Sequence, residues 1–488
     1  MYPLNLKALT LALCLAAPLL THAQSEYEAW LEANSFDAQA AQQEFQDYMD
    51  ENDKEFVGFL KQQWKKVDLE TPIVLDTTPK PVQLPIAEPQ PVIKQPTRPI
   101  EPVVQTLPPK PTPPTYTPKP VIDELKSDQI SIAFYGHNIA LPKVSANAFR
   151  FNNKPNSKSI ANHWETMSKQ KHGHMIDALK KQKKYYHLND WALALLATEY
   201  AIELGLNDTN SQQLFAWFLL VKSGYDARLA YNQNAFILMP SQQALFGVTY
   251  FTLHNKKYYA VSFSGEKVNA GRAYTYSGKH ETAQRNVDFS GASKTLPSNN
   301  LQSRKLSFTY DKAKHDINLD YDLSQVQFSN TLPQMDIQYY PQQGLPDATA
   351  QQLLNQLKPL IKGRSELDAV NLLLRFVQTA FTYKTDEQQF DQENYLLPIE
   401  TLHYPYSDCE DRAAIFSWLV ESLLGLDAVL LDYPGHIAAA VHFNQTPPGD
   451  SLSHKGKTYT VTDPTFINAN AGMAMPQFKN NKPKILNF

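Results

Sequence analysis

Hydrophobic residues along the chain follow helix-like spacing in some stretches and strand-like alternation in others. Apolar side chains recur every three or four positions over residues 175–205 and again from Asp347 to Ile361, which predicts amphipathic helices. A further helix is predicted after Ser365, because Asp368 completes a capping pair ahead of an apolar run. We interpret these apolar positions as core and assign them no function.

Strand-like alternation marks other parts of the chain. Residues 129–135 alternate apolar and polar side chains, which predicts a strand. Residues 286–345 contain several such runs separated by polar turns, and we interpret them as a small antiparallel β module. The strands predicted in this module cover residues 305–310, 317–321, 326–328 and 336–340. Helical and strand patterns together predict an α+β fold.

The N-terminus has the pattern of a secretory signal peptide over residues 1–23. Lys7 precedes an apolar run from Ala8 to Leu20, which is too short to span a bilayer comfortably. Thr21-His22-Ala23 forms a small-x-small cleavage site. We therefore expect a periplasmic or secreted protein with no transmembrane helix after cleavage. An uncleaved N-terminal anchor is the alternative.

Residues 24–70 are acidic and have helical spacing, with apolar side chains along one stripe. The stripe consists of Phe45, Tyr48, Met49, Phe56, Phe59, Leu60 and Trp64. We expect this stripe to pack on the segment itself or on the main body. The alternative is a docking surface for a partner in the cell envelope.

Residues 71–122 differ in composition from the rest of the chain. Sixteen of the 34 prolines lie between residues 72 and 120, with lysines and an arginine scattered among them. Such a segment cannot build a core, so we expect an extended or disordered linker that acts as a spacer. A tether that lets the C-terminal body search from an N-terminal docking point is the alternative.

Composition narrows the class of protein. A length of 488 residues predicts about two to four domains. The net charge of −4, the sequence pI of about 6.4 and the lack of a long basic cluster argue against nucleic-acid binding. The chain also has no glycine-rich phosphate loop and no GxSxG motif, so nucleotide chemistry and serine hydrolysis have no support.

One cysteine remains after the predicted cleavage, because Cys14 lies in the segment that would be removed. Cys409 stands where a helix is predicted to begin, with Asp408 as N-cap and Asp411 as its capping partner. The N-terminus of a helix lowers the pKa of a thiol, whereas the carboxylates of Glu410 and Asp411 raise it. A neighbouring histidine is therefore needed to activate Cys409. A buried, inert cysteine is the alternative.

A histidine and an aspartate are predicted to meet on paired strands downstream of Cys409. Strand-like runs over residues 436–443 and 457–463 flank a polar loop that contains Gly449. If they pair about this loop, the numbers of opposite residues sum to about 900, and those of His436 and Asp463 sum to 899. The spacing therefore lets Asp463 orient the imidazole of His436.

Three motifs resemble the bacterial transglutaminase-like superfamily, whose fold is papain-like. They are Ser407-Asp408-Cys409-Glu410-Asp411, Pro434-Gly435-His436 and Asp463-Pro464-Thr465-Phe466. The resemblance covers residues 350–480 and implies a catalytic domain over residues 346–488. It implies Cys409 as nucleophile, His436 as general base and Asp463 as its partner, acting on a peptide or protein amide without a cofactor. Members act as peptidases, amidases, cross-linkers or inactive scaffolds, so a catalytically silent envelope scaffold is the alternative.

An internal repeat precedes this domain. Residues 215–229 echo residues 416–430 at an offset of 201, and residues 254–261 echo residues 454–461 at an offset of 200. We interpret residues 124–285 as a degenerate transglutaminase-like domain. At the offset of 201, Asp208, Ala235 and Ser262 replace the cysteine, histidine and aspartate, so this copy lacks the chemistry.

Further side chains are candidates for the same site. Tyr383, Gln388 and Gln389 lie between the predicted helix and Cys409 and are candidate oxyanion or substrate-binding groups. Each is also compatible with a polar surface loop.

Two alternatives concern the histidine and a metal. His403, His442 and His454 compete with His436 for the role of base, but none has a predicted carboxylate partner on a neighbouring strand. Zinc bound by Cys409, His436 and Asp463 is disfavoured, because these residues lack the closely spaced ligand pair of most zinc sites. We therefore expect no metal.

Overall fold

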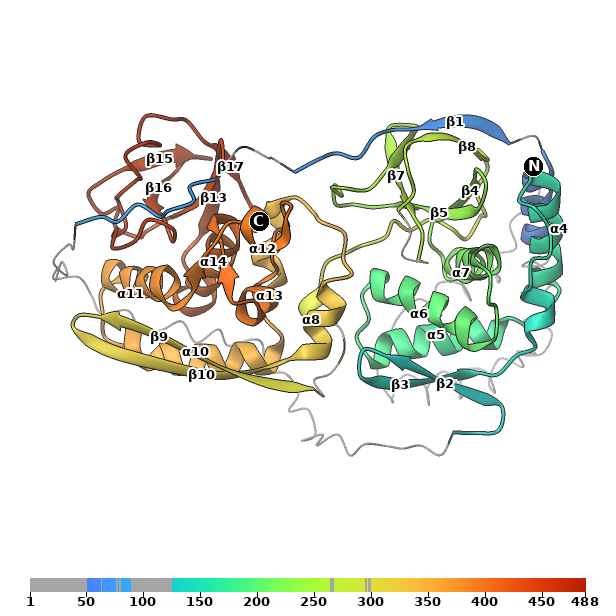
Figure 1. Cartoon of the computed structure of the whole chain (residues 1–488), viewed down its shortest axis with the longest axis horizontal. Coiled ribbons are helices and arrows are strands. Elements are labelled where there is room, and N and C mark those ends of the chain that lie inside the picture. The colour runs from blue at the N-terminus through green and yellow to red at the C-terminus, as the bar shows by residue number, and fades with distance from the viewer. Residues whose placement is uncertain are drawn as a thin grey trace, which may run out of the picture. The chain divides into compact units, whose positions relative to one another are not determined.

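The computed structural model describes residues 51–62, 64–75, 78, 80–88, 125–263, 267–294, 296 and 300–488, and it shows a mixed α+β protein (Figure 1). The predicted signal peptide, the first half of the acidic segment and most of the proline-rich stretch lie outside these residues. The chain divides into residues 1–55 and residues 56–488.

A six-stranded sheet is the centre of the N-terminal half. Its strands, in spatial order, are β1 (Lys65–Leu69), β8 (Gly271–Thr275), β4 (Arg228–Tyr231), β5 (Ala235–Pro240), β7 (Lys256–Val261) and β6 (Tyr250–Leu253). The other elements of this half are the hairpin β2 (Gln129–Phe134) and β3 (His137–Pro142), with α4 (Ser157–Ser168), α5 (Gly173–Tyr185), α6 (Asp190–Glu203) and α7 (Thr209–Lys222). Helix α7 is buried almost throughout and packs on β4 and β5.

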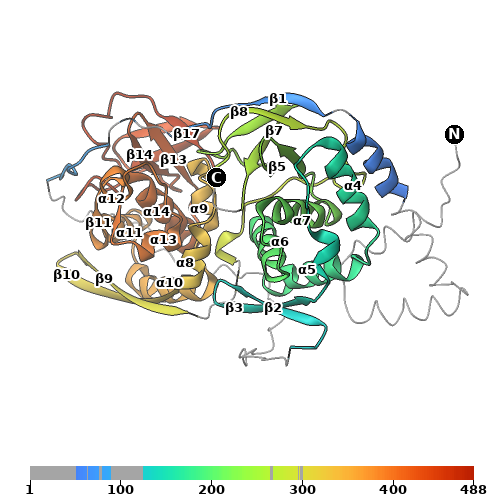
Figure 2. The same cartoon turned by 45° about the vertical axis from the view of Figure 1, so that its right-hand side comes forward.

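A five-stranded sheet is the centre of the C-terminal half. Its strands, in spatial order, are β15 (Ser451–His454), β16 (Lys457–Thr462), β14 (His436–Val441), β13 (Ala428–Tyr433) and β17 (Lys484–Leu486). Around it lie α10 (Asp347–Ile361), α11 (Glu366–Ala380), α12 (Asp386–Phe390), α13 (Pro398–His403) and α14 (Cys409–Leu424), with the short strands β11 (Thr382–Tyr383) and β12 (Tyr406–Ser407). Helix α14 packs on β13 and β14 (Figure 2).

The two halves repeat one arrangement of a helix and a sheet. In the first half, α7 is followed by β4, β5, β6 and β7, and in the second half α14 is followed by β13, β14, β15 and β16. The strands also occupy the same places in their sheets, because the order β6-β7-β5-β4-β8 matches β15-β16-β14-β13-β17. The repeat detected in the sequence is therefore present as a repeat of topology.

Individual polar contacts recur with the topology. Asp226 accepts hydrogen bonds from Lys256 Nζ and Tyr258 Oη, both at 2.8 Å. Asp427 accepts from Lys457 Nζ at 2.6 Å and from Tyr459 Oη at 2.8 Å. Each pair of equivalent residues is separated by 201 positions. These contacts and the bounds of β7 and β16 relate the two segments by 201 positions, so the offset of 200 predicted for residues 254–261 is wrong by one.

The alignment of the two repeats needs one correction at the helix. Helix α7 begins at Thr209 after the N-cap Asp208, and α14 begins at Cys409 after Asp408. The offset is 200 at this point, so the counterpart of Cys409 is Thr209 rather than Asp208. Ala235 and His436 both open their strands, as the alignment predicted.

Part of the predicted β module is helical. Strands β9 (Leu301–Tyr310) and β10 (Ala313–Asp322) form the predicted antiparallel hairpin. Residues 326–328 lie instead in α8 (Leu323–Ser329), and residues 337–339 form a 3-10 helix before α9 (Tyr340–Gln343). The side chain of Asp322 accepts hydrogen bonds from the backbone N–H groups of Ser324 and Gln325, and this N-cap ends the strand pattern.

The acidic segment and the linker also depart from the prediction. Residues 65–69 form strand β1, which pairs with β8, rather than continuing the helix. Phe56, Leu60 and Trp64 of the apolar stripe are buried against the main body, and the Phe56 ring lies 4.8 Å from that of Trp164. The Ile73 carbonyl accepts a hydrogen bond from Gly247 N–H, so the start of the proline-rich stretch contacts the body.

None of the helices within the described part of the chain has the length and apolar character needed to cross a membrane.

Candidate functional site

Cys409 is the first residue of α14, as the capping pattern predicted. The Asp411 carboxylate accepts a hydrogen bond from the Asp408 N–H at 3.1 Å, which satisfies one free donor at this helix end. The carboxylate of Asp408 has other partners, because its Oδ2 accepts from Lys80 Nζ at 2.8 Å and from Asp386 N–H at 3.3 Å. The start of α14 is therefore held by contacts with distant parts of the chain.

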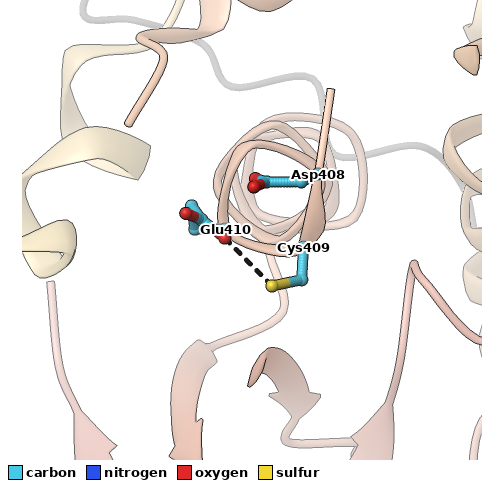
Figure 3. A group of neighbouring side chains, drawn as sticks. All are labelled: Asp408, Cys409 and Glu410. Atoms are coloured by element: carbon cyan, nitrogen blue, oxygen red, sulfur yellow. Dashed lines mark hydrogen bonds between the residues drawn. The ribbon is translucent and has the colours of Figure 1, made fainter. Parts of the chain in front are cut away.

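The Cys409 thiol is buried and hydrogen-bonded to the next residue, Glu410. Its Sγ donates a hydrogen bond to Oε2 of Glu410 at 2.9 Å (Figure 3). Burial, and then the charge of Glu410, raise the pKa of the Cys409 thiol well above its ordinary value, although Lys80 opposes them. The lowering expected from the helix N-terminus is therefore outweighed, and in this arrangement Cys409 is a neutral thiol.

Several carboxyl groups lie close together at the N-terminal end of α14. Burial and the neighbouring carboxylates raise the pKa of Asp386 to about 11. Burial and Glu410 raise the pKa of Asp408 to about 8, and burial and Asp408 raise that of Asp411 well above its ordinary range. Protonation relieves repulsion that the nearby cations do not neutralise.

Lys80, from the proline-rich stretch, is the cation among these groups. Its ammonium forms ion pairs with Asp408 and Glu410, with Glu393, and with Asp386 at 3.8 Å. The Lys80 side chain is only 8 % exposed, and its pKa is raised by Glu410 and Asp408 against the opposing effect of burial. The linker thus supplies a side chain to the site rather than acting only as a spacer.

His436 and Asp463 meet as the sequence predicted. Strands β14 and β16 pair with Ala439 opposite Thr462, so the numbers of opposite residues sum to 901 rather than about 900. His436 and Asp463 are therefore diagonal neighbours on one face of the sheet. His436 Nε2 lies 2.8 Å from Asp463 Oδ2, and both side chains are buried.

Neighbouring groups hold this pair in place. Asp463 Oδ1 accepts hydrogen bonds from the N–H groups of Thr465 and Phe466 at 2.9 and 3.2 Å. The imidazole of His436 stacks on the Phe478 ring at 4.8 Å. With Nε2 used by Asp463, the buried Nδ1 of His436 has no hydrogen-bond partner in the described part of the protein.

Helix α14, which begins with Cys409, packs on β14, which begins with His436. Residues 425–427 form the short connection from α14 to β13. The hairpin turn at Pro434 and Gly435, where Gly435 has φ of 70°, then starts β14 at His436. The Cys409 thiol is nevertheless bonded to Glu410, and no hydrogen bond links it to His436 in the residues described.

The three oxyanion candidates occupy different environments. Tyr383 Oη donates to the Pro81 carbonyl at 2.7 Å, and burial is the main cause that raises the pKa of Tyr383. Gln388 is exposed, and its Oε1 accepts from the Thr385 N–H at the start of α12. Gln389 Nε2 lies 3.5 Å from the Tyr406 carbonyl. Of the three, only Tyr383 is placed beside the acidic groups and the thiol.

The competing histidines have partners of their own. A ring nitrogen of His403 lies 3.0 Å from Tyr321 Oη, one of His442 lies 2.9 Å from the Thr458 carbonyl, and one of His454 lies 3.0 Å from Asn487 Oδ1. Of the four candidate histidines, only His436 is bonded to a carboxylate.

Comparison with known proteins gives no relative. No protein-family model, curated protein or solved structure matches the chain. Any functional assignment therefore rests on the residues and their geometry.

Sequence reasoning missed Lys80, Asp386, Glu393 and Tyr395 as parts of this site. Lys80 and Asp408 are 328 positions apart, so no local pattern connects them. The Lys80 ammonium also lies over the Tyr395 ring, 5.9 Å from its centre. A signal was nevertheless present, because three acidic residues lie between positions 408 and 411 and Arg412 is the one cation beside them in the sequence.

Proposed function

We propose that the protein is an exported cysteine acyl-transfer enzyme of the transglutaminase-like superfamily, with a papain-like catalytic domain over residues 346–488. The observation that carries this proposal is the buried His436–Asp463 pair, in which Nδ1 has no partner among the described residues. Helix α14, which begins with Cys409, packs on the strand that begins with His436. A base oriented by a carboxylate beside a helix-start thiol is the arrangement that nucleophilic catalysis requires.

In the proposed reaction, Cys409 Sγ attacks the carbonyl carbon of a peptide or protein amide as its proton passes to Nδ1 of His436. The tetrahedral adduct collapses when His436 returns that proton to the leaving amine, and a thioester remains on Cys409. Water or a second amine then attacks the thioester, with His436 again transferring the proton. The products are a carboxylic acid or a new amide, and Asp463 holds the imidazole throughout.

The described arrangement corresponds to a latent state of this enzyme. Glu410 accepts a hydrogen bond from the Cys409 thiol, and burial followed by the charge of Glu410 raises the pKa of Cys409, so the thiolate is suppressed. Activity requires rotation of the thiol from Glu410 towards His436. Tyr383, beside the same groups, is the candidate that is placed to contact a bound acyl group.

A catalytically silent scaffold is the second candidate. It is favoured by the neutral, buried thiol and by the first repeat, where Thr209, Ala235 and Ser262 replace the three reactive residues. In this case both repeats serve recognition only.

Alkylation of Cys409 by iodoacetamide distinguishes the two. In the chain carrying Cys14→Ser, Cys409 is the sole thiol. If His436 activates it, His436→Ala lowers the alkylation rate at pH 7 by about tenfold, because the thiolate fraction follows the thiol pKa. Glu410→Gln raises the rate, and the control His442→Ala leaves it unchanged. Equal rates in all four proteins would establish the scaffold.

A further inference from the structure

Four carboxyl groups at the start of α14 surround one lysine side chain. We call this group, made of Asp386, Glu393, Asp408 and Glu410, the acidic socket. Three of its members are almost fully buried, and Lys80 Nζ is paired with all four. Because isolated buried carboxylates are costly, the socket requires a cation or bound protons.

The socket has more hydrogen-bond acceptor atoms than the Lys80 ammonium can satisfy. Oδ1 of Asp408, a residue with no exposed surface, has no hydrogen-bond partner among the residues that the structure describes. The raised pKa values of Asp386 and Asp408 show the same imbalance of charge. The geometry is that of a binding site for an ammonium group, and Lys80 is the group that occupies it.

The chain around Lys80 is bound through its backbone as well as through the lysine side chain. Tyr383 Oη donates to the Pro81 carbonyl at 2.7 Å. Further along, Ala87 N–H donates to the Ile467 carbonyl at 2.8 Å, and Ile467 N–H donates to the Pro85 carbonyl at 3.1 Å. Recognition therefore uses backbone groups in addition to the lysine.

Side-chain exposure supports this reading of the segment. Val82 is 63 % exposed and Ile86 is 72 % exposed, although both are apolar. The Lys80 side chain and Ala87 are the most buried parts of the segment. Val82 and Ile86 contribute little to the contact, and Lys80 is the one charged side chain that the segment buries.

The sequence around Lys80 occurs a second time in the same chain. Residues 78–82 read Thr-Pro-Lys-Pro-Val, and residues 117–121 repeat these five residues without change. A third lysine, Lys110, also lies between two prolines but lacks the flanking threonine and valine. The identity ends after Val121, so the second copy matches the part that enters the socket and lacks a counterpart of Ala87.

We propose that the acidic socket is a recognition site for a proline-flanked lysine, and that residues 117–121 compete with Lys80 for it. Prolines on both sides fix φ and keep the peptide extended, which lowers the entropy lost on binding. The lysine supplies the ammonium that four carboxyl groups require. This inference concerns binding and does not depend on the chemistry proposed for Cys409.

Acetylation of lysines by an amine-reactive ester, read by mass spectrometry, tests the competition in the full chain. In Lys80→Met the socket becomes available, and the acetylation rate of Lys119 falls by about tenfold relative to wild type, because a paired, buried amine is protected. Lys94, which has no proline on either side, serves as internal control and keeps its rate. An unchanged rate at Lys119 in a variant with a native circular dichroism spectrum would overturn the proposal.

A second measurement uses only the wild-type chain and therefore does not depend on the variant folding. Excess synthetic Thr-Pro-Lys-Pro-Val displaces Lys80 and raises its acetylation rate several-fold, about as expected from simple competition. The same peptide with methionine in place of lysine has no effect. If both peptides leave the Lys80 rate unchanged, the socket does not recognise the repeated sequence.

Discussion

Lys80→Met is the substitution whose effect on stability follows most directly from the structure. It removes the ammonium that is paired with four carboxyl groups and preserves much of the apolar length of the side chain. The socket then carries one more uncompensated negative charge. The folded protein can leave that charge buried, or it can bind one additional proton.

The two routes have different costs. Leaving a buried charge unpaired typically costs about 3–5 kcal/mol. Binding one extra proton to an aspartate of ordinary pKa near 3.9 costs the folded state about 1.4 kcal/mol for each pH unit above that value. The expected loss in the free energy of unfolding is therefore about 2 kcal/mol at pH 5 and about 4 kcal/mol at pH 7.

The sign of the pH dependence follows from linkage. A carboxyl whose pKa is raised on folding is most favourable to the fold below its ordinary pKa, and this contribution is lost as pH rises towards the folded value. Removing Lys80 raises the carboxyl pKa values further, so the variant must lose more stability than wild type with each pH unit.

Urea unfolding followed by circular dichroism at pH 5 and pH 7 measures this difference. Lys61→Met is the matched control, because Lys61 pairs with Glu165 at 3.2 Å on the surface and the pair contributes less than about 1 kcal/mol. A Lys80→Met loss that is the same at both pH values, or no larger than that of the control, would refute the reasoning.

Other expected outcomes concern the socket and the loops. The pKa of Asp408 is raised to about 8, and Asp408→Asn replaces this carboxyl with a group that is neutral at every pH. The free energy of unfolding of the variant therefore declines less steeply between pH 4 and pH 8, by up to about 1.4 kcal/mol per pH unit. Urea unfolding measures this slope, and the same slope in wild type and variant would contradict the prediction. Gly449→Ala places a Cβ in collision with the Gly472 carbonyl oxygen at a φ of 126° and should cost about 3 kcal/mol. Gly363→Ala, at a φ of 77° with open space around it, should cost about 1 kcal/mol, and thermal unfolding of the two variants measures both losses.

Strands β14 and β16, which position His436 and Asp463, could be predicted because the sequence patterns that specify them lie within a few residues of each strand. Period-two alternation and the loop between them set the pairing of β14 with β16 to within one residue, which is enough to bring His436 and Asp463 to one face. The start of α14 at Cys409 was equally readable, because helix caps depend on residues within one turn.

The failures have a common physical cause. Residues 326–328 alternate like a strand, but they follow the Asp322 cap and lie in helix α8, with Val326 and Phe328 buried and Gln327 exposed. Residues 65–69 follow a helical stripe, yet they pair with a strand about two hundred positions away. Lys80 shows the same limit, because its partners are distributed from Asp386 to Glu410. Contacts with distant parts of the chain determine these elements, and the spacing of residues within each segment cannot predict those contacts.

Comparison of the two repeats separates contacts that both copies have from contacts that only one copy has. The first copy keeps the Asp226 contacts to Lys256 and Tyr258, which are the counterparts of those made by Asp427, so these contacts belong to the architecture itself. In the first copy, Asp208 uses its carboxylate to cap α7 through Ser211 N–H at 2.8 Å. In the second copy, the equivalent carboxylate is turned to Lys80. Asp208 therefore stabilises its own helix, whereas Asp408 binds the distant Lys80. The shared architecture does not require this second contact, so it is a property of the second copy alone.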